Sequence, residues 1–138
     1  MNTQADIVRV RREVLGRLLE EARSAPELEC CGLLAGRDGV ISLVLPARNA
    51  LASATAYEIA TPELFALFRR MRDEQLDHLG IYHSHPNSDN VPSPSDVERA
   101  YYPEAAQFIL SPRLDAPRPI RAFRIAIGHS RELKMERI

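Results

Sequence analysis

The segment Ile81-Tyr82-His83-Ser84-His85-Pro86 constrains the fold of this chain more than any other. Residues 78–85 predict a buried strand, which Pro86 would end. Side chains two residues apart on a strand point to the same face, so His83 and His85 would project together. Two such imidazoles can supply half of a zinc site, or they can be half-buried histidines with ordinary hydrogen bonds. A metal site would need a further ligand, which the rest of the chain must bring to this strand end.

A candidate third ligand follows in a stretch rich in Pro, Ser, Asn and Asp. Asp96 lies eleven residues after His85, at the start of a short helix predicted over residues 95–101. The positive end of the helix dipole would keep this carboxylate ionised, which suits a zinc ligand. The other interpretation is that Ser93 and Asp96 only cap the helix. Two histidines and one carboxylate leave one position for water, an arrangement typical of a catalytic zinc site.

Glu29 is a candidate for proton transfer at such a site. Zinc lowers the pKa of a bound water towards ~7, and amide hydrolysis also needs a group that carries a proton to the leaving nitrogen. Glu29 precedes the apolar run Cys30–Ala35 without fitting its pattern. The alternative is that Glu29 is a surface residue at the end of a strand.

Short strands and amphipathic helices alternate along the rest of the chain. Strands are predicted over residues 7–10, 30–35, 40–45, 57–59, 78–85, 107–110, 120–127 and 133–138. One helix is predicted over 12–23, ended by Pro26, and another begins with Thr61 as N-cap and Pro62 at its first position. In the short third helix, Ser95 and Glu98 resemble a capping box. Interleaved hairpins and helices predict an α/β fold around one mixed sheet, with residues 1–138 as a single domain.

Composition narrows the expected environment and partners. The formal net charge of −1 provides no global attraction to nucleic acid or to an anionic membrane. No apolar run approaches the ~20 residues that cross a bilayer, and Met1–Arg12 has no signal-peptide core. Cys30 and Cys31 are adjacent, and neighbouring cysteines rarely form a disulfide because their Cα atoms lie only ~3.8 Å apart. Two unpaired thiols indicate a reducing compartment. We therefore expect a cytoplasmic protein without a nucleic-acid or membrane partner.

Two local features each allow a plain and a functional interpretation. Cys30 and Cys31 are either packing residues or a redox pair, and packing is favoured because free cysteine is usually a small buried hydrophobe. The arginines at Arg113, Arg118, Arg121 and Arg124 are either a solvated face or a docking patch for an acidic partner.

The candidate metal ligands and catalytic residues together resemble the JAMM motif of MPN-domain metalloproteases. His83-Ser84-His85-Pro86, Ser93 and Asp96 match the family pattern His-Ser/Thr-His-Pro, a loop, then Ser-x-x-Asp. Glu29-Cys30-Cys31-Gly32 matches the upstream Glu-x-x-Gly, and Asn49 is a weaker correspondence. The resemblance covers essentially the whole chain. It implies the MPN fold, which is cytidine-deaminase-like: a mixed, mostly antiparallel β-sheet flanked by helices.

The resemblance also implies a role for each residue. His83, His85 and Asp96 would bind one catalytic Zn²⁺, and Glu29 would act as general base and then general acid. Ser93 would hydrogen-bond to the substrate carbonyl oxygen as it becomes an oxyanion, while Ser84 would face away from the metal and support the loop.

The connections over residues 49–57 and 100–107 are short, as in compact bacterial members of the family. Such members are similar to an enzyme that releases cysteine from the C-terminal glycine of a sulfur-carrier protein. The resemblance thus implies hydrolysis of a peptide or isopeptide bond after a ubiquitin-like carboxyl terminus. The expected partner is a β-grasp, sulfur-carrier-type protein whose Gly-Gly tail would lie extended against a sheet edge. The sequence leaves the oligomeric state open.

Three other interpretations compete with a JAMM peptidase. A non-catalytic MPN scaffold typically lacks one or more ligands, whereas this chain has all five site residues. A barrel amidohydrolase opening with His-x-His needs ~250 residues, which 138 residues exclude. A non-haem iron oxygenase also uses two histidines and a carboxylate, but Glu29 and the Ser-x-x-Asp loop would then have no purpose.

Overall fold

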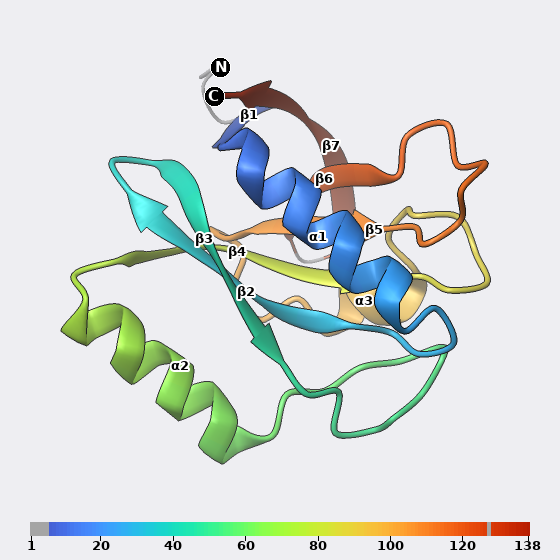
Figure 1. The fold of residues 1–138 in the computed structure, drawn as a ribbon, viewed down its shortest axis with the longest axis horizontal. Coiled ribbons are helices and arrows are strands. Elements are labelled where there is room, and N and C mark those ends of the chain that lie inside the picture. The colour runs from blue at the N-terminus through green and yellow to red at the C-terminus, as the bar shows by residue number, and fades with distance from the viewer. Residues whose placement is uncertain (1–5, 127) are drawn as a thin grey trace.

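Seven strands and three helices make up the part of the chain that the computed structural model describes, residues 6–126 and 128–138. The helices are α1 (Arg12–Ser24), α2 (Thr61–Asp73) and α3 (Pro94–Glu98). The strands are β1 (Ile7–Val10), β2 (Cys31–Arg37), β3 (Val40–Ala47), β4 (Asp77–Ser84), β5 (Ala106–Leu110), β6 (Ile120–Ala126) and β7 (His129–Arg137). Figure 1 shows them in chain order. No helix of the described residues has the length and apolar character needed to span a membrane.

The strands form one mixed sheet that closes on itself. Their order is β1-β3-β2-β4-β5-β6-β7, and β1 also pairs with β7. The pairs β2–β3, β2–β4, β5–β6 and β6–β7 are antiparallel, whereas β1–β3, β1–β7 and β4–β5 are parallel. The prediction of a mixed, mostly antiparallel sheet flanked by helices is therefore confirmed. What the sequence did not indicate is that the sheet closes.

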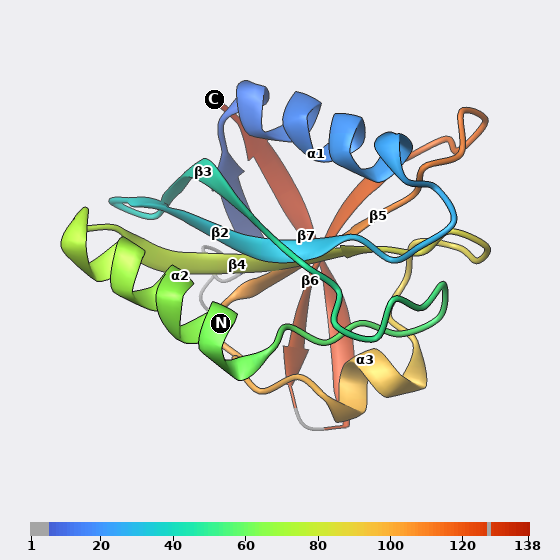
Figure 2. The same ribbon diagram turned by 60° about the horizontal axis from the view of Figure 1, so that its bottom comes forward.

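Helices cover opposite faces of the central strands, as Figure 2 shows for α1 on one side and α2 and α3 on the other. Leu18 of α1 belongs to a core cluster with Leu34 and Tyr82. On the other face, Met71 of α2 packs in a cluster with Leu33 and Ile81. Consecutive residues of β2 and β4 thus alternate between two cores, as the period of a strand requires. His83, two residues after Ile81, continues the row on the α2 and α3 side.

The predicted strand over residues 57–59 is wrong, because this segment lies in an irregular connection between β3 and α2. Its backbone bonds to other residues of that connection, for example from the Ala50 N–H to the Glu58 carbonyl (2.8 Å). Three residues of alternating polarity are consistent with a strand, but they do not show whether another strand is available to pair with them. Here they lie in an irregular connection.

Helix starts differ from prediction by one or two residues. The N-cap of α2 is Ala60 rather than Thr61, since the Ala60 carbonyl accepts the first helical hydrogen bond from Leu64 (2.9 Å). Pro62 consequently stands at the second helical position. The capping box of α3 is formed by Ser93 and Asp96, not by Ser95 and Glu98. The predicted strand 120–127 ends at Ala126, and its last residue lies outside the described part of the chain.

Candidate functional site

The carboxyl end of β4 presents His83 and His85 side by side. His83 pairs with Cys31 of β2 on one side and with Ile109 of β5 on the other, so its backbone is held in the middle of the sheet. His85 lies just beyond β4, and its N–H donates to the Leu110 carbonyl (2.9 Å), which continues the pairing. Both side chains are buried and lie on the same side, as the strand period predicted.

Ser84 points to the opposite face. Its Oγ accepts a hydrogen bond from the N–H of Cys30 (2.9 Å), the residue that follows Glu29. Ser84 thus faces away from the histidines, as predicted, but its hydroxyl bonds to the backbone before β2 rather than to the loop after His85. The supported segment is the one that precedes β2 and carries Glu29.

Asp96 reaches the two histidines from the first turn of α3. Its Oδ1 lies 3.2 Å from Nε2 of His83, and its Oδ2 lies 3.1 Å from Nε2 of His85. Ser93 is the N-cap: its Oγ accepts from the Asp96 N–H (3.1 Å), and Oδ2 of Asp96 accepts from the Ser93 N–H (2.8 Å). Capping and contact with the histidines were alternatives in the sequence. In the structure the same carboxylate does both, because the capping box orients Asp96 towards β4.

The geometry of this cluster fits a single metal ion. The Nε2 atoms of His83 and His85 lie 3.1 Å apart. Nitrogen ligands of one tetrahedral zinc, each bound at ~2.0–2.1 Å, would be about 3.3 Å apart. Nδ1 of His85 lies 2.8 Å from the Asp89 carbonyl, which can only accept, so Nδ1 carries the proton and a neutral ring leaves the lone pair of Nε2 free. Nitrogen and carboxylate donors of this kind suit zinc.

Burial and mutual contacts perturb the protonation of all three residues. Burial lowers the pKa of His83, which favours the neutral ring able to bind a metal. Burial also acts to lower the pKa of His85, but its hydrogen bonds to Asp96 and to the Asp89 carbonyl outweigh this effect and raise it. For Asp96, hydrogen bonds to the histidines outweigh burial and hold the pKa far below its usual range. The cluster therefore contains a permanent carboxylate.

Glu29 is a buried carboxyl group close to this cluster. Only 4% of the residue is exposed, and among the described residues its Oε1 has no hydrogen-bond partner. Burial raises the pKa of Glu29 to about 7, while His85 acts to lower it and Asp96 to raise it. Cys31, two residues after Glu29, stands opposite His83 in the sheet, which places Glu29 close to the cluster. The surface-residue alternative for Glu29 is wrong.

Gly32 ends the Glu-x-x-Gly pattern, and the packing around it leaves no room for a side chain. A Cβ atom at this position would lie 2.5 Å from both the Leu45 carbonyl oxygen and the Tyr82 hydroxyl. That hydroxyl donates to Oε2 of Glu21 on α1 (2.6 Å), so it cannot move aside freely. The absence of a side chain at Gly32 leaves room for the Tyr82 ring and for the Leu45 carbonyl of β3.

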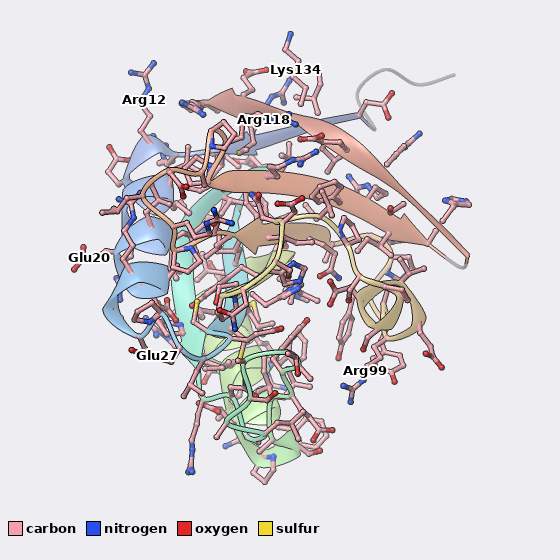
Figure 3. The ribbon with its side chains drawn as sticks, turned by 90° about the vertical axis from the view of Figure 1, so that its right-hand side faces the viewer. Arg12, Glu20, Glu27, Arg99, Arg118 and Lys134 are labelled. Atoms are coloured by element: carbon pink, nitrogen blue, oxygen red, sulfur yellow. The ribbon has the colours of Figure 1, made fainter. Side chains whose placement is uncertain are left out.

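Sequence reasoning missed one residue of the site, Tyr57. Its ring stacks on the imidazole of His83 with centroids 4.7 Å apart and planes at 21°. Both residues line a cavity of about 210 Å³, as do Asp96, Arg99 and Tyr101. Figure 3 shows Arg99 projecting outward from α3. No local signal predicts this contact, because it depends on how the β3–α2 connection folds back over β4.

The structure gives the environments of the two features that the sequence left ambiguous, the adjacent cysteines and the arginine cluster. Cys31 is fully buried, and burial raises the pKa of the Cys30 thiol to about 11 and that of Cys31 to about 12, which favours packing over thiolate chemistry. Most of the arginine cluster is engaged with acidic groups: Arg118 and Arg121 share Glu132, and Arg113 pairs with Asp115.

The chain is similar to several known proteins. The family model described as prokaryotic homologs of the JAB domain matches residues 11–126. The chain is 36% identical to a desampylase from Haloferax volcanii, over 74% of this chain and 76% of the relative. It is 31% identical to the CysO-cysteine peptidase of Mycobacterium bovis, over 86% and 83% of the two chains. A protein from Desulfitobacterium hafniense of known solution structure superposes with a TM-score of 0.81 at 28% identity, covering 96% and 92%.

The family match spans most of the chain, and its relatives are peptidases of similar length. In the structure, His83, His85 and Asp96 lie close enough together to hold one metal ion, and Glu29 is buried. The chain therefore belongs to the prokaryotic JAB-domain family of JAMM-type peptidases.

Proposed function

We propose that this protein is a zinc-dependent peptidase that hydrolyses the amide bond after the C-terminal glycine of a ubiquitin-like, sulfur-carrier-type protein. One observation carries the proposal: the buried carboxyl group of Glu29, whose pKa is raised and whose Oε1 has no hydrogen-bond partner among the described residues, lies near the His83–His85–Asp96 cluster. A buried acid without a partner costs stability, so its presence beside metal-ligand donors favours a chemical role.

The metal site would be formed by Nε2 of His83, Nε2 of His85 and the carboxylate of Asp96. Bound zinc would act as a Lewis acid that makes a water molecule and the scissile carbonyl more reactive. Glu29 would accept a proton from the attacking water and deliver it to the leaving nitrogen. Burial raises the pKa of Glu29 above that of an exposed glutamate, which favours both accepting and returning a proton near neutral pH.

Ser93 is the proposed hydrogen-bond donor to the substrate carbonyl oxygen. Its Oγ accepts from the Asp96 N–H as the cap of α3, so the hydroxyl proton remains available for donation. A donor directed at developing negative charge is worth about 3 kcal/mol of transition-state stabilisation. The cap also keeps the hydroxyl within one helical turn of Asp96.

The names of two relatives support the substrate class. One is a desampylase and another a CysO-cysteine peptidase, and the chain covers about three quarters or more of each. We propose that the present chain likewise cleaves a conjugate of a small β-grasp protein with a Gly-Gly tail.

The sheet offers a place for an extended tail. Among the described residues, β3 pairs with β1 only at Val40 and Ile41, which leaves the later residues of β3 unpaired on that side. Ala47, near the end of this stretch, pairs with Cys31, which in turn pairs with His83. A tail added as a strand here would run towards the metal cluster.

The test uses two defined substrates. A Gly-Gly-ending sulfur-carrier protein carrying one additional C-terminal cysteine, and the same protein joined to a lysine side chain, are each incubated with zinc-loaded enzyme and followed by mass spectrometry. We expect release of carrier ending in Gly-Gly, and no release by Glu29→Gln. Absence of cleavage of both conjugates by a zinc-loaded, folded protein would refute the proposed activity.

A non-catalytic MPN scaffold is the alternative, and metal analysis separates the two. A scaffold would bind no stoichiometric zinc, whereas the proposed peptidase retains about one zinc per chain after dialysis against metal-free buffer.

A further inference from the structure

The connection between β3 and α2 is irregular, and the side chain of Asn49 cross-links its backbone. Nδ2 of Asn49 donates to the carbonyl of Ala56 (2.9 Å) and to that of Glu29 (3.1 Å). Oδ1 of Asn49 accepts from the N–H of Glu58 (3.2 Å). Because Ala56 and Glu58 flank Tyr57, Asn49 fixes the backbone on both sides of that residue.

The two histidines of the cluster are oriented in different ways. A metal-binding histidine ordinarily donates its second ring N–H to an acceptor, which fixes the ring. Nδ1 of His85 has such an acceptor in the Asp89 carbonyl (2.8 Å). Nδ1 of His83 is buried and has no hydrogen-bond partner among residues 6–126 and 128–138. Something else must hold the His83 ring.

The ring of Tyr57 is the only aromatic face stacked on His83 among the described residues. A centroid separation of 4.7 Å and an interplanar angle of 21° lie within the range of favourable offset stacking. Rotation of the imidazole about its Cβ–Cγ bond would break this contact. An imidazole that binds a cation also becomes electron-poor, and the face of a tyrosine ring attracts such a group.

We propose that Tyr57, held in place by Asn49, is a positioning residue of the metal site that replaces the missing hydrogen bond of His83. The stacked ring keeps Nε2 of His83 directed at Asp96, 3.2 Å away. Because Asn49 also binds the Glu29 carbonyl, one side chain ties the proposed base and this metal ligand to the same loop. The inference rests on the proposed metal site.

Zinc affinity tests this role directly. Tyr57→Phe keeps the ring, Tyr57→Leu removes it, and Tyr101→Leu is the matched control, since Tyr101 lines the same cavity but is 74% exposed. Affinity for Zn²⁺ is measured by competition with a chromophoric chelator. The visible spectrum of bound Co²⁺ reports ligand geometry, and thermal unfolding of the metal-free proteins reports folding.

We expect Tyr57→Phe and Tyr101→Leu to bind zinc within about twofold of the native protein. Tyr57→Leu should bind zinc about tenfold more weakly and show an altered Co²⁺ spectrum while remaining folded. If Tyr57→Leu does not fold, Tyr57→Met replaces it, since it retains much of the apolar volume.

Native zinc affinity and an unchanged Co²⁺ spectrum in the folded, ring-less variant would overturn the positioning role. Equal losses in Tyr57→Phe and Tyr57→Leu would also overturn it, because the hydroxyl rather than the ring would then matter. Failure of the native protein to bind zinc would instead refute the proposed function, so the two failures are distinguishable.

Discussion

Replacing Glu29 by glutamine should abolish turnover and, at the same time, stabilise the metal-free protein at alkaline pH. The physical reason is that burial raises the pKa of Glu29 from 4.5 to about 7. In the unfolded chain this group ionises near 4.5, so folding is penalised at any pH above that value. The penalty is absent at low pH, grows as the pH rises from 4.5 to 7, and is constant above 7.

The magnitude follows from the size of the pKa change. At 1.36 kcal/mol per pKa unit, a rise from 4.5 to about 7 corresponds to at most about 3–4 kcal/mol at pH 8. For a chain of this length, that would raise the melting temperature by up to ~10 °C. Bound zinc places positive charge near the carboxylate, so the gain should shrink in the zinc-loaded protein.

Thermal unfolding of metal-free native protein and Glu29→Gln at pH 5 and pH 8 measures the stability change. Zinc content and cleavage of the carrier–cysteine conjugate measure the functional change. Glu27→Gln is the matched control, since Glu27 is exposed two residues away and lies at the outer edge of the molecule in Figure 3. Native turnover in Glu29→Gln, or a stability gain no larger at pH 8 than at pH 5, would refute the reasoning.

Other substitutions distinguish effects on zinc binding from effects on the stability of the fold around the proposed site. Asp96→Ala should lose both stoichiometric zinc and activity, because it removes a proposed ligand and half of the α3 capping box; zinc retained at one per chain would contradict the proposed ligand set. Ser84→Ala should lower the free energy of unfolding in urea by about 1–2 kcal/mol, because the Cys30 N–H loses its acceptor, yet keep its zinc. Gly32→Ala should cost at least about 2 kcal/mol, since the new Cβ would lie 2.5 Å from the Leu45 carbonyl; native stability in the same assay would show that β2 can shift.

Local periodicity made part of the site predictable. His83 and His85 project together because a strand repeats every two residues, and Pro86 marks where the strand stops. The helix after the loop was predicted as well, although its N-cap is Ser93 rather than Ser95. Two serines could cap this short helix. The cap is Ser93 because the carboxylate of Asp96 accepts a hydrogen bond from the Ser93 N–H.

The remaining site depended on contacts between segments far apart in the chain. Glu29 reaches the cluster because β2 pairs with β4, which sets Cys31 opposite His83, a register that no local pattern contains. From the pattern alone Glu29 was as consistent with a surface position, and only the family motif favoured it as the base. Tyr57, predicted in a strand, instead stacks on His83.

The sequence by itself determined the chemical identity of the donors and the face on which the two histidines lie. Both follow from residue type and from the geometry of neighbouring residues on one strand. Only the tertiary structure decided that Glu29 is buried with its Oε1 unpaired among the described residues, that Tyr57 stacks on His83 and that the sheet closes. These features arise from pairing and packing between distant segments, whose free energies depend on the whole fold rather than on any short stretch of sequence.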